Sequence, residues 1–445
     1  MTDPPQPHAT ESALVRAIGV RGLAAGIFNV TIGGGIFVLP AVVAGDLGSA
    51  APIAYLVCAA VMGLIVLCFA EAGSRVSLTG GPYAYVEIAF GPYVGFLAGV
   101  LLWLLATFSM ASVGTAFAGS VGALVPGLAN RAAGAAVLAL LFGALTWINV
   151  RGVKQGTRLI EFTSVAKLLP LILFVVAGAF FVDGDNLRIP ELPGPGRVAE
   201  ACIVLIFAFS GVESALVPSG EVRDPARVVP RAIALAMTLV TVMYLGIHVV
   251  AQGVLGPELA QHAAAPLADA SRVFLGEAGR LVLLFAAIIA MFGYASGMTL
   301  AVPRALFAFG RDGILPSAVA AVHPRFRTPH VAIVIQSIVV VLLAATGTFR
   351  RLAVFANVSA LLCYLICCVA AWELRRRDIR AGGATPFRVP GGALVPVLAS
   401  AVIVWLLVAG TPPRVFLLVG LALALATVLF VLARPHRRSP AAEGA

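Results

Sequence analysis

Charged residues are scarce in this sequence. Asp, Glu, Lys and Arg together make up 11% of its 445 residues, whereas soluble domains carry about 25%. Hydrophobic residues make up 60%, which excludes a soluble enzyme, a secreted disulfide scaffold and a disordered chain. At about 20 residues per membrane-spanning helix, the length allows about a dozen spans with short connections. We therefore predict an all-α integral membrane protein that crosses the bilayer many times.

Metal ligands are also few: the chain has six cysteines and six histidines. All six cysteines lie in apolar runs without C-x-x-C metal spacing, and buried free cysteine packs as a small hydrophobe. No H-E-x-x-H motif occurs, and no Cys/His pair has ligand spacing. The glycines at 33–35 are not a dinucleotide fingerprint, because no strand precedes them and no G-x-G-x-x-G follows. The sequence thus predicts no metal, no cofactor and no enzymatic activity.

Apolar runs separated by Gly, Pro and Arg predict twelve membrane spans. They cover residues 17–44, 51–74, 93–119, 133–150, 159–182, 198–219, 230–255, 279–308, 330–348, 352–373, 391–410 and 413–433. With the N-terminus inside, 21 Lys and Arg residues fall in cytoplasmic stretches and eight on the opposite side. This distribution follows the positive-inside rule. The polar start lacks the features of a signal peptide, so residues 1–16 and 434–445 are predicted to be cytoplasmic tails.

Two predicted spans contain residues that interrupt helices. The first carries Gly33, Gly34 and Gly35 at mid-membrane, and each glycine costs about 1 kcal/mol relative to alanine in a helix. The sixth places Gly211 and the acidic Glu213 near its middle. Interrupted spans at corresponding places in two halves of a chain indicate a transporter binding site built on inverted repeats. The alternative is that the glycines only let neighbouring helices approach closely.

Several motifs in this order and spacing resemble the amino acid–polyamine–organocation (APC) transporter superfamily. They are GGGIF at 33–37, EAGSR at 71–75, TGGPYAY at 79–85, FAFSGVE at 207–213, EVRDP at 221–225, PRAI at 230–233, PRAL at 303–306 and GRDGILP at 310–316. The resemblance implies a LeuT-like fold of five plus five helices in inverted repeat, with helices 1 and 6 broken. The transport core would be 17–373, with repeats at 17–182 and 198–373, and 391–433 would add two C-terminal helices.

The two interruptions together predict a substrate site for an amino acid. Backbone N–H groups freed at the three glycines lie at the start of a half-helix, whose positive end favours a carboxylate. Freed carbonyls around the two breaks can accept hydrogen bonds from the ammonium. The predicted binding residues are Thr31, Ile32, Gly33, Gly34, Gly35, Phe207, Ser210 and Gly211. The resemblance implies that the Phe207 ring closes over the substrate, and ordinary packing is the alternative.

Lys167 lies inside the fifth span, about 12 Å along it at about 1.5 Å per residue. The chain has 28 arginines and only two lysines, and a lysine, unlike an arginine, can lose its proton when buried. In proton-coupled relatives a lysine at this place contacts the unwound first span, so the resemblance implies that Lys167 carries the coupled proton and makes sodium unnecessary. The alternative is a static lysine that caps freed carbonyls. Glu213 either orients the broken helix or takes part in proton coupling.

Other polar residues of the spans receive weaker interpretations. We interpret His248 as a packing residue rather than a proton relay, and we expect Glu71 and Arg75 to form a charge pair at the cytoplasmic end. Three residues of the third span are expected to face the substrate side chain: Trp103, Thr107 and Ser109.

The sequence therefore predicts a secondary transporter that takes neutral L-amino acids across a bacterial inner membrane by proton symport. The alternatives are an amino acid or amine exchanger without proton coupling, a membrane-embedded enzyme, and a passive channel. The expected partners are the small-molecule substrate and membrane lipids, and no nucleic acid. Neither the exact substrate nor the oligomeric state follows from these patterns.

Overall fold

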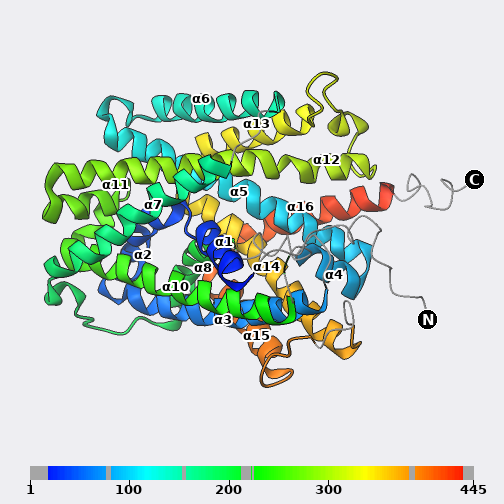
Figure 1. The fold of residues 1–445 in the computed structure, drawn as a ribbon, viewed down its shortest axis with the longest axis horizontal. Coiled ribbons are helices and arrows are strands. Elements are labelled where there is room, and N and C mark those ends of the chain that lie inside the picture. Colours follow the sequence, from blue (N-terminus) through cyan, green and yellow to red (C-terminus); the bar gives the residue numbers. More distant parts are fainter. Residues whose placement is uncertain are drawn as a thin grey trace, which may run out of the picture.

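The structure is a computed structural model that describes residues 19–76, 82–152, 157–211, 222, 225–379 and 386–433, without the side chains of 157–165 and 225–226. Within these residues no β-strand occurs, and the all-α prediction is confirmed. The α-helices (Figure 1) are α1 (Val20–Thr31), α2 (Leu39–Leu47), α3 (Ala51–Arg75), α4 (Pro82–Phe90), α5 (Pro92–Leu124), α6 (Arg131–Val150), α7 (Thr157–Gly178), α8 (Pro195–Phe209), α10 (Pro225–Leu255), α11 (Pro266–Ala301), α12 (Pro303–Arg311), α13 (His330–Thr346), α14 (Phe349–Arg376), α15 (Leu394–Gly410) and α16 (Pro413–Ala433).

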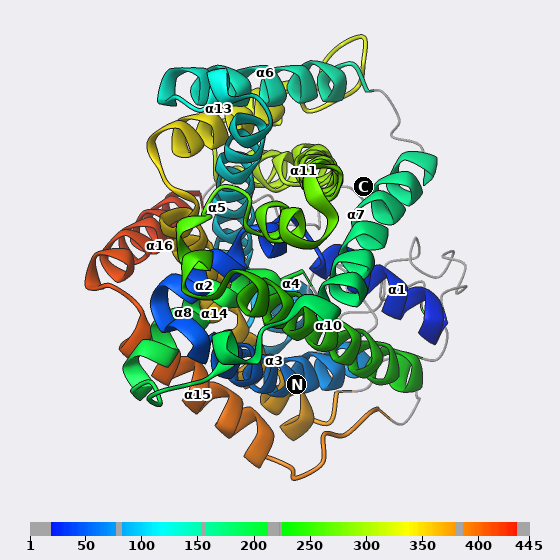
Figure 2. The same ribbon diagram turned by 90° about the vertical axis from the view of Figure 1, so that its left-hand side faces the viewer.

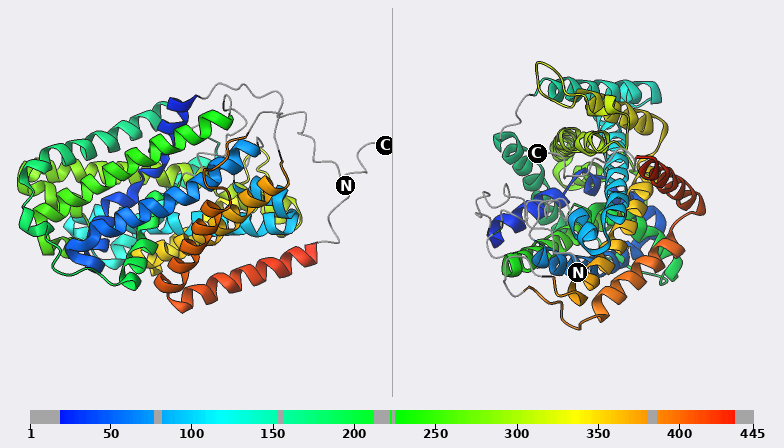
Figure 3. Two further views of the ribbon diagram at one scale, coloured as in Figure 1. Left: turned by 90° about the horizontal axis from the view of Figure 1, so that it is seen from below. Right: turned by 90° about the vertical axis from the view of Figure 1, so that its right-hand side faces the viewer.

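Many of these helices are suited to a bilayer. In the described part of the chain, seven are long and apolar enough to cross a membrane, and three shorter apolar helices accompany them. Most of the long helices run along one axis of the molecule, as Figure 1 and the left view of Figure 3 show. Helices overlap all twelve predicted ranges. This architecture is that of a multi-pass membrane protein.

Some helix boundaries differ from the prediction. The eighth predicted span began at residue 279, but α11 starts at Pro266 and passes through a kink at Gly276, where φ is +65°. Glycine tolerates this positive φ, and Gly276 is a non-helical point that separates two helical stretches of the range 266–301. Pro303 then starts the separate helix α12. Helix α4 was not predicted, because its nine residues are shorter than a span.

The first predicted span is broken as expected. Helix α1 ends at Thr31, and the N–H of Gly33 donates to the carbonyl of Thr31 at 2.8 Å. With Ile32 at φ −75° and ψ 80°, this is an inverse γ-turn. A 3₁₀ turn, Gly34–Phe37, then leads into α2. The helical path is thus interrupted at the glycines.

Helix α8 ends at Phe209, well before the predicted limit of its span at residue 219. Ser210 is extended, with φ −69° and ψ 151°, and Gly211 follows with φ +121°. Helix α8 therefore ends inside the sixth predicted span, and this end and the glycine turn of the first span are called the two breaks below. The rest of this span, which includes Glu213 and the predicted second half of the broken helix, lies outside the described residues.

The two breaks are held in the interior of the bundle by α10. This helix packs against α1, α3 and α7, and Figure 2 shows α1, α3 and α10 together on the lower side of the molecule. Helices α6 and α13 form a pair at the opposite edge in the same view. The central helices therefore bury the breaks, while the paired helices lie outside them.

The two C-terminal helices pack on the rest of the bundle. Helix α15 contacts α3, α8 and α14. At Gly410 a side-chain Cβ would lie 2.6 Å from the carbonyl oxygen of Ala199 on α8, so only glycine lets these backbones come this close. Helix α16 packs on α5, where the rings of Phe96 and Phe430 stack with centroids 5.2 Å apart.

Candidate functional site

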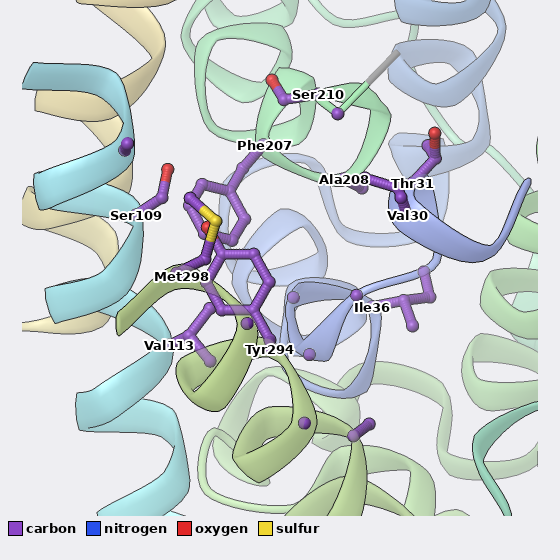
Figure 4. Close-up of a pocket in the computed structure, with 18 of the residues that line it drawn as sticks. Val30, Thr31, Ile36, Ser109, Val113, Phe207, Ala208, Ser210, Tyr294 and Met298 are labelled. Atoms are coloured by element: carbon purple, nitrogen blue, oxygen red, sulfur yellow. The ribbon is translucent and has the colours of Figure 1, made fainter. Parts of the chain in front are cut away.

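A cavity of about 480 Å³ lies where the two breaks face α5 and α11. Figure 4 shows Phe207, Tyr294 and Met298 projecting into it, with Ser109 and Val113 on the α5 wall. Its volume falls within the range of small-molecule sites. The lining residues are Asn29, Val30, Thr31, Gly33, Gly34, Gly35, Ile36, Pro82, Leu102, Leu105, Ala106, Ser109, Val113, Lys167, Phe207, Ala208, Ser210, Gly211, Ala290, Gly293, Tyr294, Gly297 and Met298.

Most of the residues predicted to bind substrate line this one cavity, and so does Lys167. The exception is Ile32, whose side chain is fully buried in the core. Glu213, predicted to support the broken helix or to take part in proton coupling, lies outside the described residues. The γ-turn explains Ile32, because it turns the chain before the glycines and aims this side chain away from the cavity. Residues from the first, fifth and sixth predicted spans are thus brought together.

The glycine turn offers fewer free amides than the sequence predicted. The N–H of Gly33 is already bonded to Thr31 within the γ-turn. Gly34 and Gly35 open the 3₁₀ turn that leads into α2, and the first amides of a helical segment have no partner inside it. These two amides therefore have no partner within the turn, and both residues line the cavity.

Close packing explains why two of these positions are glycine. A Cβ on Gly35 would lie 2.7 Å from the Phe207 ring, and a Cβ on Gly34 would lie 2.5 Å from Cγ of Met291. Gly33, in contrast, has extended backbone, and no heavy atom lies closer than 4.0 Å to a Cβ placed there. The break is thus fitted tightly against α8 and α11 only from Gly34 onward.

We expect alanine to have opposite effects at the two ends of the glycine turn. Gly35→Ala forces the Phe207 ring to move and should lower stability by about 1–3 kcal/mol, as overpacking does. Gly33→Ala meets no clash and should raise stability by about 0.4–1 kcal/mol by restricting the unfolded chain. Thermal unfolding of the purified variants in detergent measures both. Equal effects of the two substitutions would contradict this description of the turn.

Lys167 connects α7 to the first break. Its Nζ donates a hydrogen bond to the carbonyl oxygen of Asn29 at 2.6 Å. No carboxylate among the described residues forms an ion pair with it. The last turn of α1, where carbonyls lack intrahelical partners, is therefore tied to α7 by a single amine.

Tyr244 on α10 is a central residue that the sequence analysis missed. Its hydroxyl lies 2.8 Å from the carbonyl oxygens of both Thr31 and Ala208, so its one proton is shared between the two breaks. The side chain is fully buried. The available signal was a tyrosine inside a largely apolar span, since a buried hydroxyl usually has a partner.

The expectation for the third span is only partly met. Ser109 lines the cavity, whereas Trp103 donates to Oε1 of Gln336 at 2.9 Å and Thr107 accepts from Nε2 of Gln336 at 3.0 Å. These two side chains tie α5 to α13 and do not line the cavity. Helix α5 is apolar on all sides, so its pattern did not distinguish the two faces.

A charge cluster ties three helices together at the end of α2. The carboxylate of Asp46 accepts from Arg350 of α14 at 2.5 Å, and the Asp46 carbonyl accepts from Arg197 of α8. These contacts join α2, α8 and α14 on the side that the positive-inside pattern assigns to the exterior.

The predicted pair of Glu71 and Arg75 is present and buried. Arg75 donates from Nη2 to Oε1 of Glu71 at 2.9 Å, and both side chains are at most 2% exposed. The other carboxylate oxygen accepts from the N–H of Val389 at 3.1 Å and from Arg375 at 3.5 Å. The pair thus joins the end of α3 to α14 and to the chain that follows it.

A bundle of apolar helices with a ligand-sized cavity at its interruptions is the architecture of a membrane transporter. Comparison with known families agrees: the family model described as "Amino acid permease" matches residues 18–433. The chain belongs to the amino acid permease family, and the resemblance to the APC superfamily is confirmed. The family consists of transporters, in line with the prediction that the chain is no enzyme.

Relatives cover nearly the whole chain. The methylthioribose transporter of Bacillus subtilis is 28% identical, over 96% of this chain and 96% of its own. The branched-chain amino acid permease BcaP of the same organism is 27% identical, over 96% and 95%. The serine/threonine exchanger SteT of Bacillus subtilis is also 27% identical, over 88% of this chain and 91% of its own.

Proposed function

We propose that this chain is a secondary active transporter of neutral L-amino acids that works by alternating access and takes up a proton with its substrate. One observation carries the proposal. The amides at the start of the Gly34–Phe37 turn and the C-terminal end of α8 line the same cavity. A positive and a negative backbone terminus therefore face one ligand-sized space.

These two ends suit the two charges of an amino acid. The amides of Gly34 and Gly35 can donate to a carboxylate, and the positive end of a helix favours an anion. The last carbonyls of α8 favour an ammonium for the converse reason. The ring of Phe207 projects into the cavity (Figure 4) and in this proposal closes over the bound substrate.

The other residues that line the cavity favour a substrate with a neutral side chain. Lys167 is the only charged residue among the described residues that line the cavity. The surface that would surround the substrate side chain is largely apolar, with Val113, Tyr294 and Met298 among its members. A cationic substrate would find no acidic partner among the described lining residues, and burying an unpaired charge costs several kcal/mol.

Lys167 supports proton coupling through its bond to Asn29. A protonated amine forms a charge-assisted hydrogen bond, which is about twice as strong as a neutral one. In this proposal the charged lysine holds α1 against α7, and loss of the proton weakens the tie so that α1 can move. The proton takes the role of coupling ion, and sodium is not required.

The relatives support two further candidates. SteT is a serine/threonine exchanger, which favours exchange without proton coupling as the alternative mechanism. The Bacillus subtilis methylthioribose transporter favours a polar thioether solute as the alternative substrate. The amides at the break argue for a carboxylate-bearing ligand over the latter.

The proposal includes the membrane arrangement. It places the chain in a bacterial inner membrane with twelve spans, both termini cytoplasmic and the two five-helix repeats inverted. The positive-inside distribution of Lys and Arg supports this orientation.

Uptake into proteoliposomes tests the proposal. Purified protein would be given labelled neutral, cationic and anionic amino acids and methylthioribose, with an inward proton gradient and no sodium. We expect one or a few neutral amino acids to accumulate only with the gradient. Uptake that ignores the gradient but requires preloaded amino acid would establish the exchanger instead. Accumulation of methylthioribose alone would show that the substrate is a solute of this kind and not an amino acid.

A further inference from the structure

A column of polar side chains runs along one face of α10. Tyr244, His248 and Gln252 follow one another at a spacing of four residues, which places them one above the other on a helix. All three are at most 2% exposed. His248 was interpreted from the sequence as a packing residue, but an ionisable residue inside a membrane span is also a candidate for function.

The middle of this column has polar atoms without partners. Neither ring nitrogen of His248 forms a hydrogen bond with a described residue, and the same holds for the Tyr55 hydroxyl on α3 and for Oε1 of Gln252. The rings of Tyr55 and His248 lie against each other with centroids 4.8 Å apart. Several unpartnered groups therefore gather at one junction of α3 and α10.

The two ends of the column lead to different places. At one end, Nε2 of Gln252 donates to the carbonyl oxygen of Gly256 at 3.1 Å and to that of Asn186 at 3.5 Å. Asn186 lies in a turn with the exposed residues Asp185 and Arg188, on the proposed outer side. At the other end, the Tyr244 hydroxyl bonds to the carbonyls of both breaks.

Unpaired buried polar atoms are costly, at about 1–3 kcal/mol each, and ordered water usually satisfies them. We propose that the α3–α10 junction at His248 binds ordered water molecules that complete a hydrogen-bonded path from the outer surface at Asn186 to the broken-helix site. The path begins at Gln252, passes Tyr55 and His248, and ends at Tyr244. The ligand of this site is water itself.

The path would carry the coupled proton from the outer surface to the site, and this part of the inference rests on the proposed function. A hydronium ion at the outer end passes its excess proton from water to water. At the cavity the proton is transferred to the neutral amine of Lys167, which becomes an ammonium while the hydronium becomes water. Thr31, whose carbonyl accepts from Tyr244, and Asn29, whose carbonyl accepts from Lys167, both line the cavity. The side-chain oxygens of both residues have no partner among the described residues.

His248 acts here by hydrogen bonding and does not need to change its charge. Among the described residues, the titratable groups along the same junction are Tyr55 and Cys58 on α3, Cys202 on α8 and Tyr244 on α10, with Lys167 on α7 beyond them. None of these is an acid that would stabilise an imidazolium next to it. Glutamine, which also donates and accepts, should therefore replace His248, whereas phenylalanine should not.

Transport assays of His248→Phe and His248→Gln test the path. We expect His248→Phe to lose most of the accumulation that a gradient of one pH unit supports, from a ratio of about ten toward one. It should keep exchange of labelled for unlabelled substrate within twofold, because exchange moves no net proton. His248→Gln should retain both activities. Thr238→Val is the control, since its hydroxyl donates to the carbonyl of Ala234 on its own helix and to no other described residue.

Each other result counts against the path. Normal accumulation by His248→Phe would show that no proton passes this residue, and loss of exchange as well would make His248 a packing residue. A glutamine variant as impaired as the phenylalanine variant would mean that His248 must titrate.

Radiolytic hydroxyl labelling with mass spectrometry tests the water site even if the wild type proves not to be proton-coupled. We expect labelling of Tyr55 and His248 well above that of Tyr364, which is equally buried but packs against Phe69. Labelling no stronger than that of Tyr364 would overturn the hydrated site. Labelling with no gradient-driven uptake by the wild type would retain the site and reject the coupling.

Discussion

Replacing Lys167 by alanine is expected to abolish proton-driven accumulation of substrate. A gradient of one pH unit is worth about 1.4 kcal/mol per proton, an accumulation ratio of about ten. The wild type should approach this ratio, and Lys167→Ala should remain near one because no group is left to carry the proton. Substrate exchange should persist, since the amides and carbonyls of the two breaks are unchanged. Parallel accumulation and exchange assays on the same proteoliposomes measure both quantities.

The Lys167→Arg variant tests whether Lys167 carries the coupled proton or only caps the carbonyls at the end of α1. Arginine keeps the donor that Asn29 accepts from, but it does not lose its proton in proteins. If Lys167 carries the proton, the arginine variant should fail to accumulate substrate as completely as the alanine variant. If Lys167 only caps the end of α1, arginine should restore accumulation. The second result would remove proton coupling through this residue from the proposal.

The second large effect is expected at the buried pair of Glu71 and Arg75. Glu71→Ala leaves the guanidinium of Arg75 buried, with only Asp378 at 4.0 Å as an acidic neighbour in the described residues. Breaking a buried ion pair in this way costs about 3–5 kcal/mol. The N–H of Val389 loses its acceptor as well. Thermal unfolding in detergent should show a markedly lower midpoint for this variant.

Glu373→Ala is the matched control, because Glu373 also pairs with arginines three and four residues away on one helix. Arg376 and Arg377 are 67% and 49% exposed, and exposed pairs contribute about 1 kcal/mol or less. The double variant Glu71→Leu/Arg75→Met removes both charges and should be more stable than Glu71→Ala alone. A double variant that is less stable would mean that the unpaired charge is not the source of the cost.

Residue type and position were sufficient to predict several parts of the site. A lysine deep in an apolar span has few structural uses, and Lys167 does lie in the cavity lining. Three consecutive glycines at mid-span predicted the break in α1 for a similar reason, since a helix is costly there. Both predictions depend on the bilayer, where a charged side chain or a helix-breaking residue is costly. Such a residue in a span therefore indicates a specific role.

Other parts depend on contacts that no local pattern encodes. The bond between Lys167 and Asn29 and the contacts of Tyr244 join residues more than a hundred positions apart in most cases. The orientation of Ile32 was unpredictable because helical periodicity is lost at the γ-turn. Helix α5 is apolar all round, so the sequence did not indicate that Trp103 faces Gln336 rather than the cavity.

The close contact of Gly410 with Ala199 bears on how this chain can be shortened. The sequence suggested a ten-helix core with two additional helices, a division that invites truncation after α14. Removing α15 would uncover the backbone of α8 at Ala199 and Ile203, both fully buried. A lipid tail would not reproduce the close backbone contact that Gly410 makes there. A shortened chain for engineering or crystallisation should therefore retain residues 391–410, and any trimming should begin beyond them.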